Sequence, residues 1–233
     1  MLKQFIIIIA VFLFSTSAAK QWVEVNSSEI GEPQPTFESN GLSLIEISFE
    51  LPGYFIESSK DGLIITAPGG VSMLKEGNPD LPIFTTSIQI PDLAKMELEI
   101  ISSDYVDLKI ETIAPSKGNI TRDINISSIP FKKGPIYKNN SFYPESISYL
   151  RSPHIIRTKR GQAVVFQPFQ YNPVKGILRV HTNIIVRVKA NGISTDNPLV
   201  RTPSKNRGER EMEEIYKRHF LNYVPTNDRY TPM

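Results

Sequence analysis

The body of the chain consists of short apolar runs in which hydrophobic and polar residues alternate, and this period limits the possible folds more than any other feature. Met96, Leu98 and Ile100 alternate with two glutamates, and the same spacing recurs at 106–110 and 184–188. Alternation with a period of two places apolar side chains on one face of an extended strand, whereas a helix needs a period near 3.6. The pattern therefore predicts strands that each bury one face.

Turn-forming residues separate these runs, among them Pro-Gly, Asn-Pro and Lys-Gly pairs. No helical period occurs before residue 208, and parallel strands would need crossover helices, so the strands should pair antiparallel. We predict an all-β fold over residues 41–190, an antiparallel β-sandwich of two sheets, jelly-roll-like, followed by a short C-terminal helix. The predicted core consists of Met96, Leu98, Ile100, Val106, Leu108, Ile110, Val164, Phe166, Ile184, Val186 and Val188.

The first 19 residues have the pattern of a secretory signal peptide. Lys3 gives a positive start, Phe5–Phe14 is an unbroken apolar run, and small residues follow up to Ala19. Ten apolar residues are too few for a membrane span, which needs about 20. We therefore expect cleavage between Ala19 and Lys20, an exported protein, and no membrane attachment after removal of the signal.

The two ends of the mature chain differ in character. Residues 20–40 are predicted to be an N-terminal extension, and the polar residues 191–207 a linker. After the linker, apolar residues recur at spacings of three and four, which predicts a helix over Glu209–Asn222 within a C-terminal segment 208–229. The apolar face of that helix consists of Met212, Ile215, Tyr216 and Phe220.

The residue inventory excludes most catalytic chemistry. The chain has no cysteine and only three histidines, His154, His181 and His219, which lie in unrelated sequence contexts. For each histidine a surface or capping role is the expectation, so we predict no metal site, no cofactor and no catalysis by these residues. A formal charge of +2 gives no electrostatic reason to expect a nucleic-acid partner.

Several short motifs, in order, resemble the N-terminal pro-domain of gingipain-type secreted cysteine peptidases. The resemblance covers roughly residues 41–232. The motifs that carry it are Leu74–Pro82 (LKEGNPDLP), Ile90-Pro91-Asp92, Phe142-Tyr143-Pro144, Arg160-Gly161, Phe166–Pro173 (FQPFQYNP) and Asp228–Pro232 (DRYTP).

The resemblance implies a partner and a processing site. The partner would be a cysteine peptidase domain downstream in the same precursor, with its catalytic Cys and His beyond Met233. The bond between Arg229 and Tyr230 would be the junction that is cut, and residues 230–233 would begin the peptidase. The pro-domain would act as an intramolecular chaperone and as a latency inhibitor that covers the active-site cleft.

In such pro-domains a basic residue on an exposed loop enters the specificity pocket of the peptidase. The corresponding interval here, between residues 129–131 and 160–161, contains Lys138, Arg151, Arg157 and Lys159. Lys138 is the first candidate because its surroundings are polar and rich in turn-forming residues, and Arg151 is the second.

Two other functions are compatible with the sequence. The chain could be a stand-alone secreted β-sandwich module for binding or adhesion, using the aromatic strand Phe166–Tyr171, although aromatic residues in sheets mostly pack in cores. It could also be a structural subunit of a cell-surface assembly. A processing junction after a helix favours the pro-domain over the stand-alone module.

Overall fold

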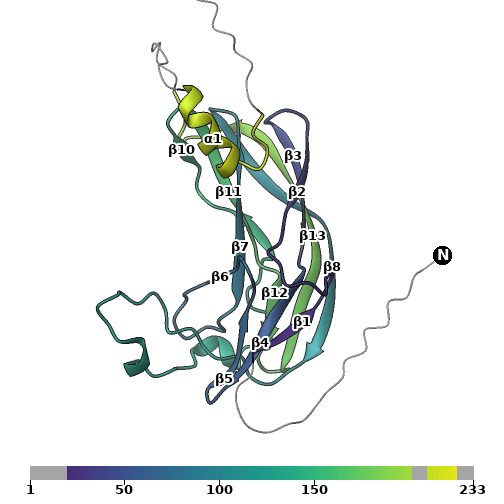
Figure 1. Ribbon diagram of the computed structural model, residues 1–233, viewed down its shortest axis with the longest axis vertical. Helices are drawn as coiled ribbons and strands as arrows, with labels where there is room; N and C mark the ends of the chain where they lie inside the picture. Colours follow the sequence, from purple (N-terminus) through teal and green to yellow (C-terminus); the bar gives the residue numbers. More distant parts are fainter. Residues whose placement is uncertain (1–19, 201–208, 225–233) are drawn as a thin grey trace, which may run out of the picture.

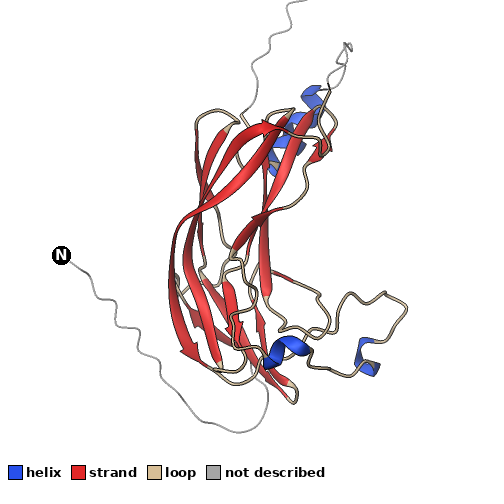
Figure 2. Cartoon of the chain, turned by 180° about the vertical axis from the view of Figure 1, so that it is seen from behind, coloured by secondary structure: helices blue, strands red, loops and turns tan. Residues whose placement is uncertain are grey.

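A computed structural model describes residues 20–200 and 209–224, and it confirms an antiparallel all-β fold that ends in a short helix. In these residues thirteen strands form three hydrogen-bonded sheets (Figures 1 and 2). No helix within the described ranges has the length and apolar character needed to cross a membrane.

We name the three sheets by their position. The long-strand sheet contains β2 (Thr36–Ser39), β3 (Leu44–Glu50), β8 (Ala94–Lys109), β12 (Phe169–Asn172) and β13 (Ile177–Ile193). The helix-side sheet contains β6 (Val71–Ser72), β7 (Pro82–Gln89), β9 (Ser148–Leu150), β10 (His154–Ile156) and β11 (Lys159–Phe166). The small sheet contains β1 (Gln21–Glu24), β4 (Gly53–Ser59) and β5 (Gly62–Thr66).

The length of two strands explains why there are three sheets where two were expected. β8 and β13 have 16 and 17 residues and pair along their whole length. At about 3.3 Å per residue they extend for more than 50 Å, about twice the reach of the eight-residue strands β7 and β11. The layer opposite them is therefore divided between the helix-side sheet and the small sheet, which lie towards opposite ends of the molecule (Figure 1).

Aromatic side chains join the layers. Phe49 of β3 stacks on Phe166 of β11, with ring centroids 4.8 Å apart, and lies 5.2 Å from the ring of Phe84 on β7. At the other end, Tyr54 of β4 meets Phe169 of β12 edge-on at 5.2 Å. All five rings are at least 94% buried, so they form the interior of the sandwich.

Most of the predicted core is correct. Met96, Val164, Phe166, Ile184, Val186 and Val188 are buried, and Leu98, Val106, Leu108 and Ile110 are partly buried. The prediction that Ile100 belongs to the core is wrong, because 42% of its surface is exposed. It lies on the edge strand β8 at a register irregularity: Ile100 pairs with Val186 but Ser102 with Ile185, which leaves Ile101 without a partner. Such a bulge turns the strand away from the opposite layer.

Helix α1 (Glu209–His219) begins where predicted but ends three residues early. Phe220 leaves the helix to form a bridge with Ser87, and the Leu221 amide donates to the Ser87 carbonyl at 2.8 Å, so the chain pairs with the open edge of β7. Tyr216 and Phe220 are buried as predicted, whereas Ile215 is 48% exposed. Only part of the apolar face predicted for this short helix is therefore buried.

The two segments predicted to flank the sandwich contain strands. β1 and β2 lie within the expected extension 20–40, and β13 runs three residues into the expected linker 191–207. Beyond β13, the amides of Ser194 and Leu199 donate to the carbonyls of Leu93 and Asp92. The first part of the linker is therefore attached to the body, and residues 201–208 lie outside the described ranges.

Candidate functional site

The largest departure from the sheets is a segment that projects sideways between β8 and β9 (Figure 1). We call residues 117–133 the arm. It contains one 3-10 turn, η1 (Ile126–Ser128), and is followed by a second, η2 (Pro135–Lys138). Within the arm, the Lys117 ammonium lies 4.3 Å from the ring centroid of Phe131 and donates to the Ile126 carbonyl at 2.9 Å. These contacts link the two halves of the arm.

Two glycines fasten the root of the arm to the turn that precedes β7. The Gly134 amide donates to the Gly77 carbonyl at 2.7 Å, and the Gly77 amide donates to the Ser116 carbonyl at 2.9 Å. Gly77 has φ = +75°, and a Cβ on Gly134 would come within 2.9 Å of the Gly77 oxygen. Neither position therefore accommodates a side chain without a shift of the backbone.

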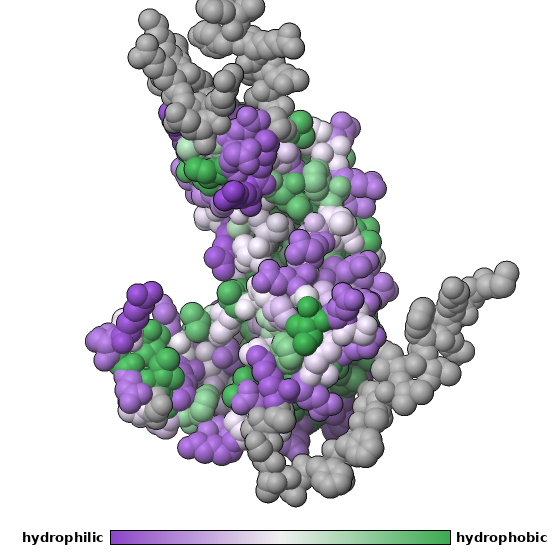
Figure 3. Space-filling model, viewed as in Figure 1, coloured by the Kyte–Doolittle hydropathy of each residue, from purple (hydrophilic) through white to green (hydrophobic). Residues whose placement is uncertain are grey.

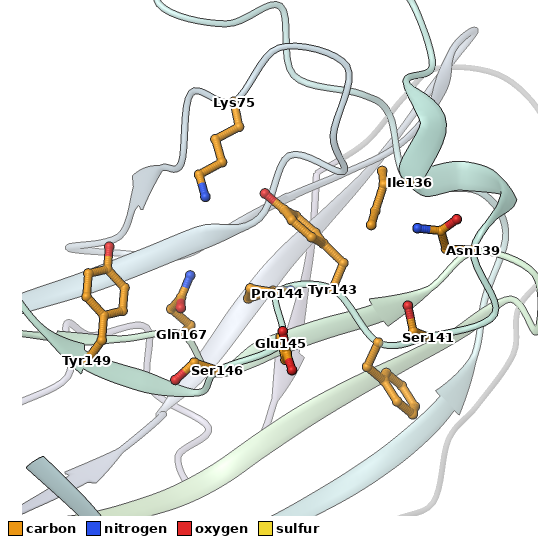
Figure 4. Close-up of a pocket in the computed structure, with 11 residues that line it drawn as sticks. Lys75, Ile136, Asn139, Ser141, Tyr143, Pro144, Glu145, Ser146, Tyr149 and Gln167 are labelled. Carbon is orange, nitrogen blue, oxygen red and sulfur yellow. The ribbon is translucent and has the colours of Figure 1, made fainter.

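An open pocket of about 840 Å³ lies beside this root (Figure 4). Lys75 reaches towards it from the turn above, while Asn139 and Tyr149 stand on opposite sides. The pocket is lined by Lys75, Ile136, Asn139, Ser141, Phe142, Tyr143, Pro144, Glu145, Ser146, Tyr149 and Gln167.

The inner wall of the pocket is firmly held. Tyr143 and Tyr171 exchange both backbone hydrogen bonds, at 2.7 and 3.0 Å, and Asn78 donates to the Tyr143 hydroxyl at 3.1 Å. Burial raises the pKa of Tyr143 above its ordinary value, so this hydroxyl remains protonated. The Gln170 side chain donates to the Pro144 carbonyl at 2.8 Å. The pocket is thus a preformed feature of the surface.

Lys138, the first inhibitory candidate, is the last residue of η2 and is exposed. Its neighbours are anchored: the Tyr137 hydroxyl donates to the Ile113 carbonyl at 2.8 Å, and the Asn139 amide donates to the Ile136 carbonyl at 3.0 Å. Ile136 and Asn139 line the pocket, so Lys138 is adjacent in sequence to its lining, on a turn that these hydrogen bonds hold.

Arg151, the second candidate, follows β9 and is two residues beyond Tyr149, towards the other side of the pocket. Its side chain is exposed, while its backbone is held by the Ala163 carbonyl at 2.9 Å and by the side-chain amide of Gln162 at 2.7 Å. Lys138 and Arg151 therefore both have exposed side chains on backbone that hydrogen bonds hold in place.

The same interval contains two further cations. Lys159 is 91% buried, with its ammonium 6.0 and 5.9 Å from the ring centroids of Tyr216 and Tyr223, so it cannot enter a cleft of another domain. Arg157 is exposed in the turn between β10 and β11 with φ = +52°. The burial of Lys159 could not be foreseen, because it depends on where the distant helix α1 docks.

Of the four residues at the expected cleavage positions, only Lys20 is among those that the structure describes. Arg229, Tyr230 and Ala19 are outside the described residues. Lys20 is exposed directly before β1, with its ammonium 4.5 Å from the ring centroid of Phe55.

The aromatic strand Phe166–Tyr171 is part of the core. Phe166, Phe169 and Tyr171 are each at most 1% exposed, as expected for packing residues. They therefore offer no platform for a carbohydrate or protein ligand, and the binding-module alternative loses the feature on which it rested.

The histidines differ most from expectation. His181 is buried, not on the surface: Ser103 Oγ lies 2.6 Å from Nδ1 and Gln170 Oε1 lies 2.9 Å from Nε2. Burial, aided by the nearby Arg179, lowers the pKa of His181 to about 4, so the ring is neutral and joins β8, β12 and β13.

The other two histidines, His154 and His219, contact each other, although 65 residues separate them in the sequence. Among the described residues no cluster of three or more His, Asp or Glu could hold a metal ion.

The arm presents a mixed surface (Figure 3). Ile124 and Ile126 are 45% and 60% exposed, and Figure 3 shows apolar surface on the arm bordered by hydrophilic residues. Four of the five ionic residues of residues 117–133 are basic: Lys117, Arg122, Lys132 and Lys133, against Asp123. The arm is therefore a cationic projection beside the pocket.

Sequence comparisons agree with the motifs. The family model Propeptide_C25 matches residues 27–229. Gingipain R2 of Porphyromonas gingivalis is 33% identical over 237 residues, which cover 100% of this chain and 32% of the relative. Gingipain R1 of the same organism is 40% identical over 164 residues, covering 70% of this chain and 16% of the relative. The chain thus spans about a third or less of the length of these curated relatives.

Solved structures share the fold. A chain from the complex of the Porphyromonas gingivalis RgpB pro- and mature domains is 34% identical, with a TM-score of 0.71 over 83% of this chain and 99% of that chain. A chain from a study of zymogenic latency in gingipain K of the same organism has a TM-score of 0.63 at 18% identity, covering 75% of this chain and 100% of that chain, which shows likeness of fold alone. The chain therefore belongs to the Propeptide_C25 family, the propeptides of gingipain-type cysteine peptidases.

Proposed function

We propose that this chain is the pro-domain of a secreted gingipain-like cysteine endopeptidase, and that it assists folding of the peptidase and keeps it latent by covering the active-site cleft. The observation that carries the proposal is the family match over residues 27–229, and the exposed Lys138 on an anchored turn supports its choice as the inhibitory residue. The similar RgpB chain comes from a complex of pro- and mature domains, and this supports a mature peptidase domain as the partner of this chain.

The proposed mode of inhibition is electrostatic. The ammonium of Lys138 pairs with a carboxylate at the base of the specificity pocket of the peptidase, and the arm and the rim of the pocket cover the cleft around it. Removing one partner of a desolvated charge pair at an interface costs about 2–5 kcal/mol, which corresponds to at least about 30-fold in the inhibition constant.

Inhibition of the cognate peptidase by the purified pro-domain tests this directly. We expect Lys138→Ala and Lys138→Met to weaken inhibition at least about 30-fold, since Met retains the aliphatic stem without the charge. Lys95→Ala, which removes an exposed cation at the start of β8, away from the arm and the pocket, is the matched control and should change inhibition less than about threefold. If Arg151→Ala causes the loss instead, Arg151 fills the pocket and the assignment to Lys138 is wrong.

We further propose that latency ends by cleavage after Arg229, and that export begins with cleavage between Ala19 and Lys20. The first proposal rests on the Asp228–Pro232 motif and on the family match, which extends to residue 229. In the precursor, Arg229→Gln should prevent maturation, while Arg157→Gln should leave it unchanged. N-terminal sequencing of the mature peptidase is the measurement, and a start other than Tyr230 contradicts the assignment.

A further inference from the structure

His154 and His219 form a contact between the sheet and the helix that the proposed inhibition does not use. His154 is the first residue of β10, and His219 is the last residue of α1. Their Nε2 atoms are 2.9 Å apart, and the two rings are perpendicular with centroids 5.1 Å apart. At this distance one Nε2–H donates to the lone pair of the other Nε2, so the pair carries exactly one proton between these two atoms when both rings are neutral.

Apolar surroundings make this pair sensitive to charge. The ring of Phe220 lies 4.7 Å from that of His219 and 6.1 Å from that of His154, centroid to centroid. Gly161 lies opposite His154 in the sheet, and its missing side chain leaves room for Phe220. Protonation of both rings would place two positive charges about 3 Å apart against an aromatic wall, and it would remove the lone pair that accepts the hydrogen bond.

The charged groups around the pair do not offset the charges of two protonated rings. On β11, Lys159 faces Tyr216 and Tyr223, and Arg160 donates to backbone carbonyls. The remaining ionic groups on these elements are Arg157 in the β10–β11 turn and, on α1, Glu213, Glu214, Lys217 and Arg218 together with Glu209, Arg210 and Glu211 in its first turn, while β7 carries none. Both glutamates pair with Lys217, at 3.9 and 3.0 Å.

We propose that His154 and His219 are a proton-operated latch, which holds α1 on the helix-side sheet near neutral pH and releases it as the medium becomes acidic. The direction follows from linkage. Burial lowers the pKa of both imidazoles, and the neighbouring imidazole lowers that of His154 further. The docked state therefore favours the neutral rings, and their stabilisation is complete above the ordinary histidine pKa of about 6.5 and is lost as the pH falls below it.

Release of α1 has a consequence for the chain that follows it. The described part of the chain ends at residue 224, five residues before Arg229, and Leu221 and Asn222 are held on β7 next to the helix. Freeing α1 would loosen this attachment and make the junction more accessible to a protease. This last step rests on the function proposed above, whereas the latch itself does not.

Hydrogen exchange of the isolated full chain tests the latch without any peptidase. Peptides covering 209–224 are followed from pH 8 to pH 5, with rates corrected for the intrinsic pH dependence of exchange. We expect the opened population of α1 to rise about tenfold per pH unit below about pH 6.5 for each extra proton bound on release. In His154→Gln or His219→Gln this slope should fall by about one proton, and in the double variant it should vanish, because glutamine retains a hydrogen-bonding group but does not titrate.

His181→Gln is the matched control, since it removes a histidine distant in sequence from the latch and should retain the slope of the parent. A parent chain whose α1 exchange does not depend on pH, or Gln variants that keep the parent slope, overturns the latch. If the Gln variants do not dock α1, proton NMR of the parent decides. Two histidines must then titrate at unequal midpoints below 6.5, and independent titration of both near 6.5 refutes the proposal. Because no peptidase is present, failure here leaves the proposed inhibition by Lys138 intact.

Discussion

At one end of the molecule α1 itself contacts the helix-side sheet through side chains, and backbone pairing begins only after it, at Phe220 and Leu221, whereas near the other end the arm is attached by backbone groups (Figure 1). Tyr216, Phe220 and the two histidines pack or bond at the helix end. At the arm, the corresponding connections are the amides and carbonyls around Gly77 and Gly134.

The difference has a physical consequence. Side-chain attachments contain titratable groups and rings that can be displaced, so docking of the helix can respond to pH or to substitution. Backbone hydrogen bonds carry no titratable group, so the root of the arm keeps its shape over a wide pH range. We propose that the docking of α1 is regulated and that the arm helps to inhibit the peptidase. These two elements are thus held in different ways.

Arg160 offers the strongest way to break the attachment at the helix end. Its side chain is fully buried, and the guanidinium donates four hydrogen bonds, to the carbonyls of Pro91, Ala94, Asp196 and Asn197. It therefore joins the start of β8 to the segment that leads towards α1. Arg160→Ala would remove all four hydrogen bonds and the buried side chain that makes them, and we expect a loss of about 3–5 kcal/mol in the free energy of unfolding.

Urea denaturation measures this loss. Arg160→Lys is the informative companion, because lysine retains the charge but lacks the planar set of donors, and it should recover only part of the stability. A change below about 1 kcal/mol in Arg160→Ala would show that the four carbonyls find water or other donors.

Gly161→Ala should destabilise only the attachment of α1 to the sheet, and by less than Arg160→Ala destabilises the fold. A Cβ at this position would lie 2.2 Å from Cε1 of Phe220 and 3.0 Å from Nε2 of His154, so the Phe220 ring must move. Overpacking of this kind costs about 1–3 kcal/mol. We expect faster hydrogen exchange in α1, with protection in β3 and β13 unchanged, and unaltered exchange in α1 would contradict this role of Gly161.

Gly134→Ala is the counterpart at the arm and should have the smallest effect. Its Cβ would press on the Gly77 carbonyl and weaken one hydrogen bond, which costs about 1 kcal/mol. We expect faster limited proteolysis within residues 117–133 and normal exchange in α1. If Gly134→Ala also releases α1, the two ends are coupled and the comparison made above fails.

The strands could be recognised from the sequence because their signal is local. Alternation in 184–188 and turn residues such as Asn172-Pro173 depend on neighbours along the chain, and the structure places strands and turns there. The division of one layer into two sheets was not visible, because it depends on how far β8 and β13 extend beyond the strands that cover them. Ile100 shows the same limit, since its exposure results from a bulge in pairing between distant strands.

For the candidate site, the sequence alone determined that Lys138 lies in an exposed turn and that no cysteine can act as a nucleophile. Turn propensity and composition are properties of short segments or of the whole inventory. Only the tertiary structure decided that Lys159 is buried under α1, that His181 is internal, and that His154 meets His219. Each of these facts depends on contacts between segments far apart in the chain, which residue spacing along the sequence does not encode.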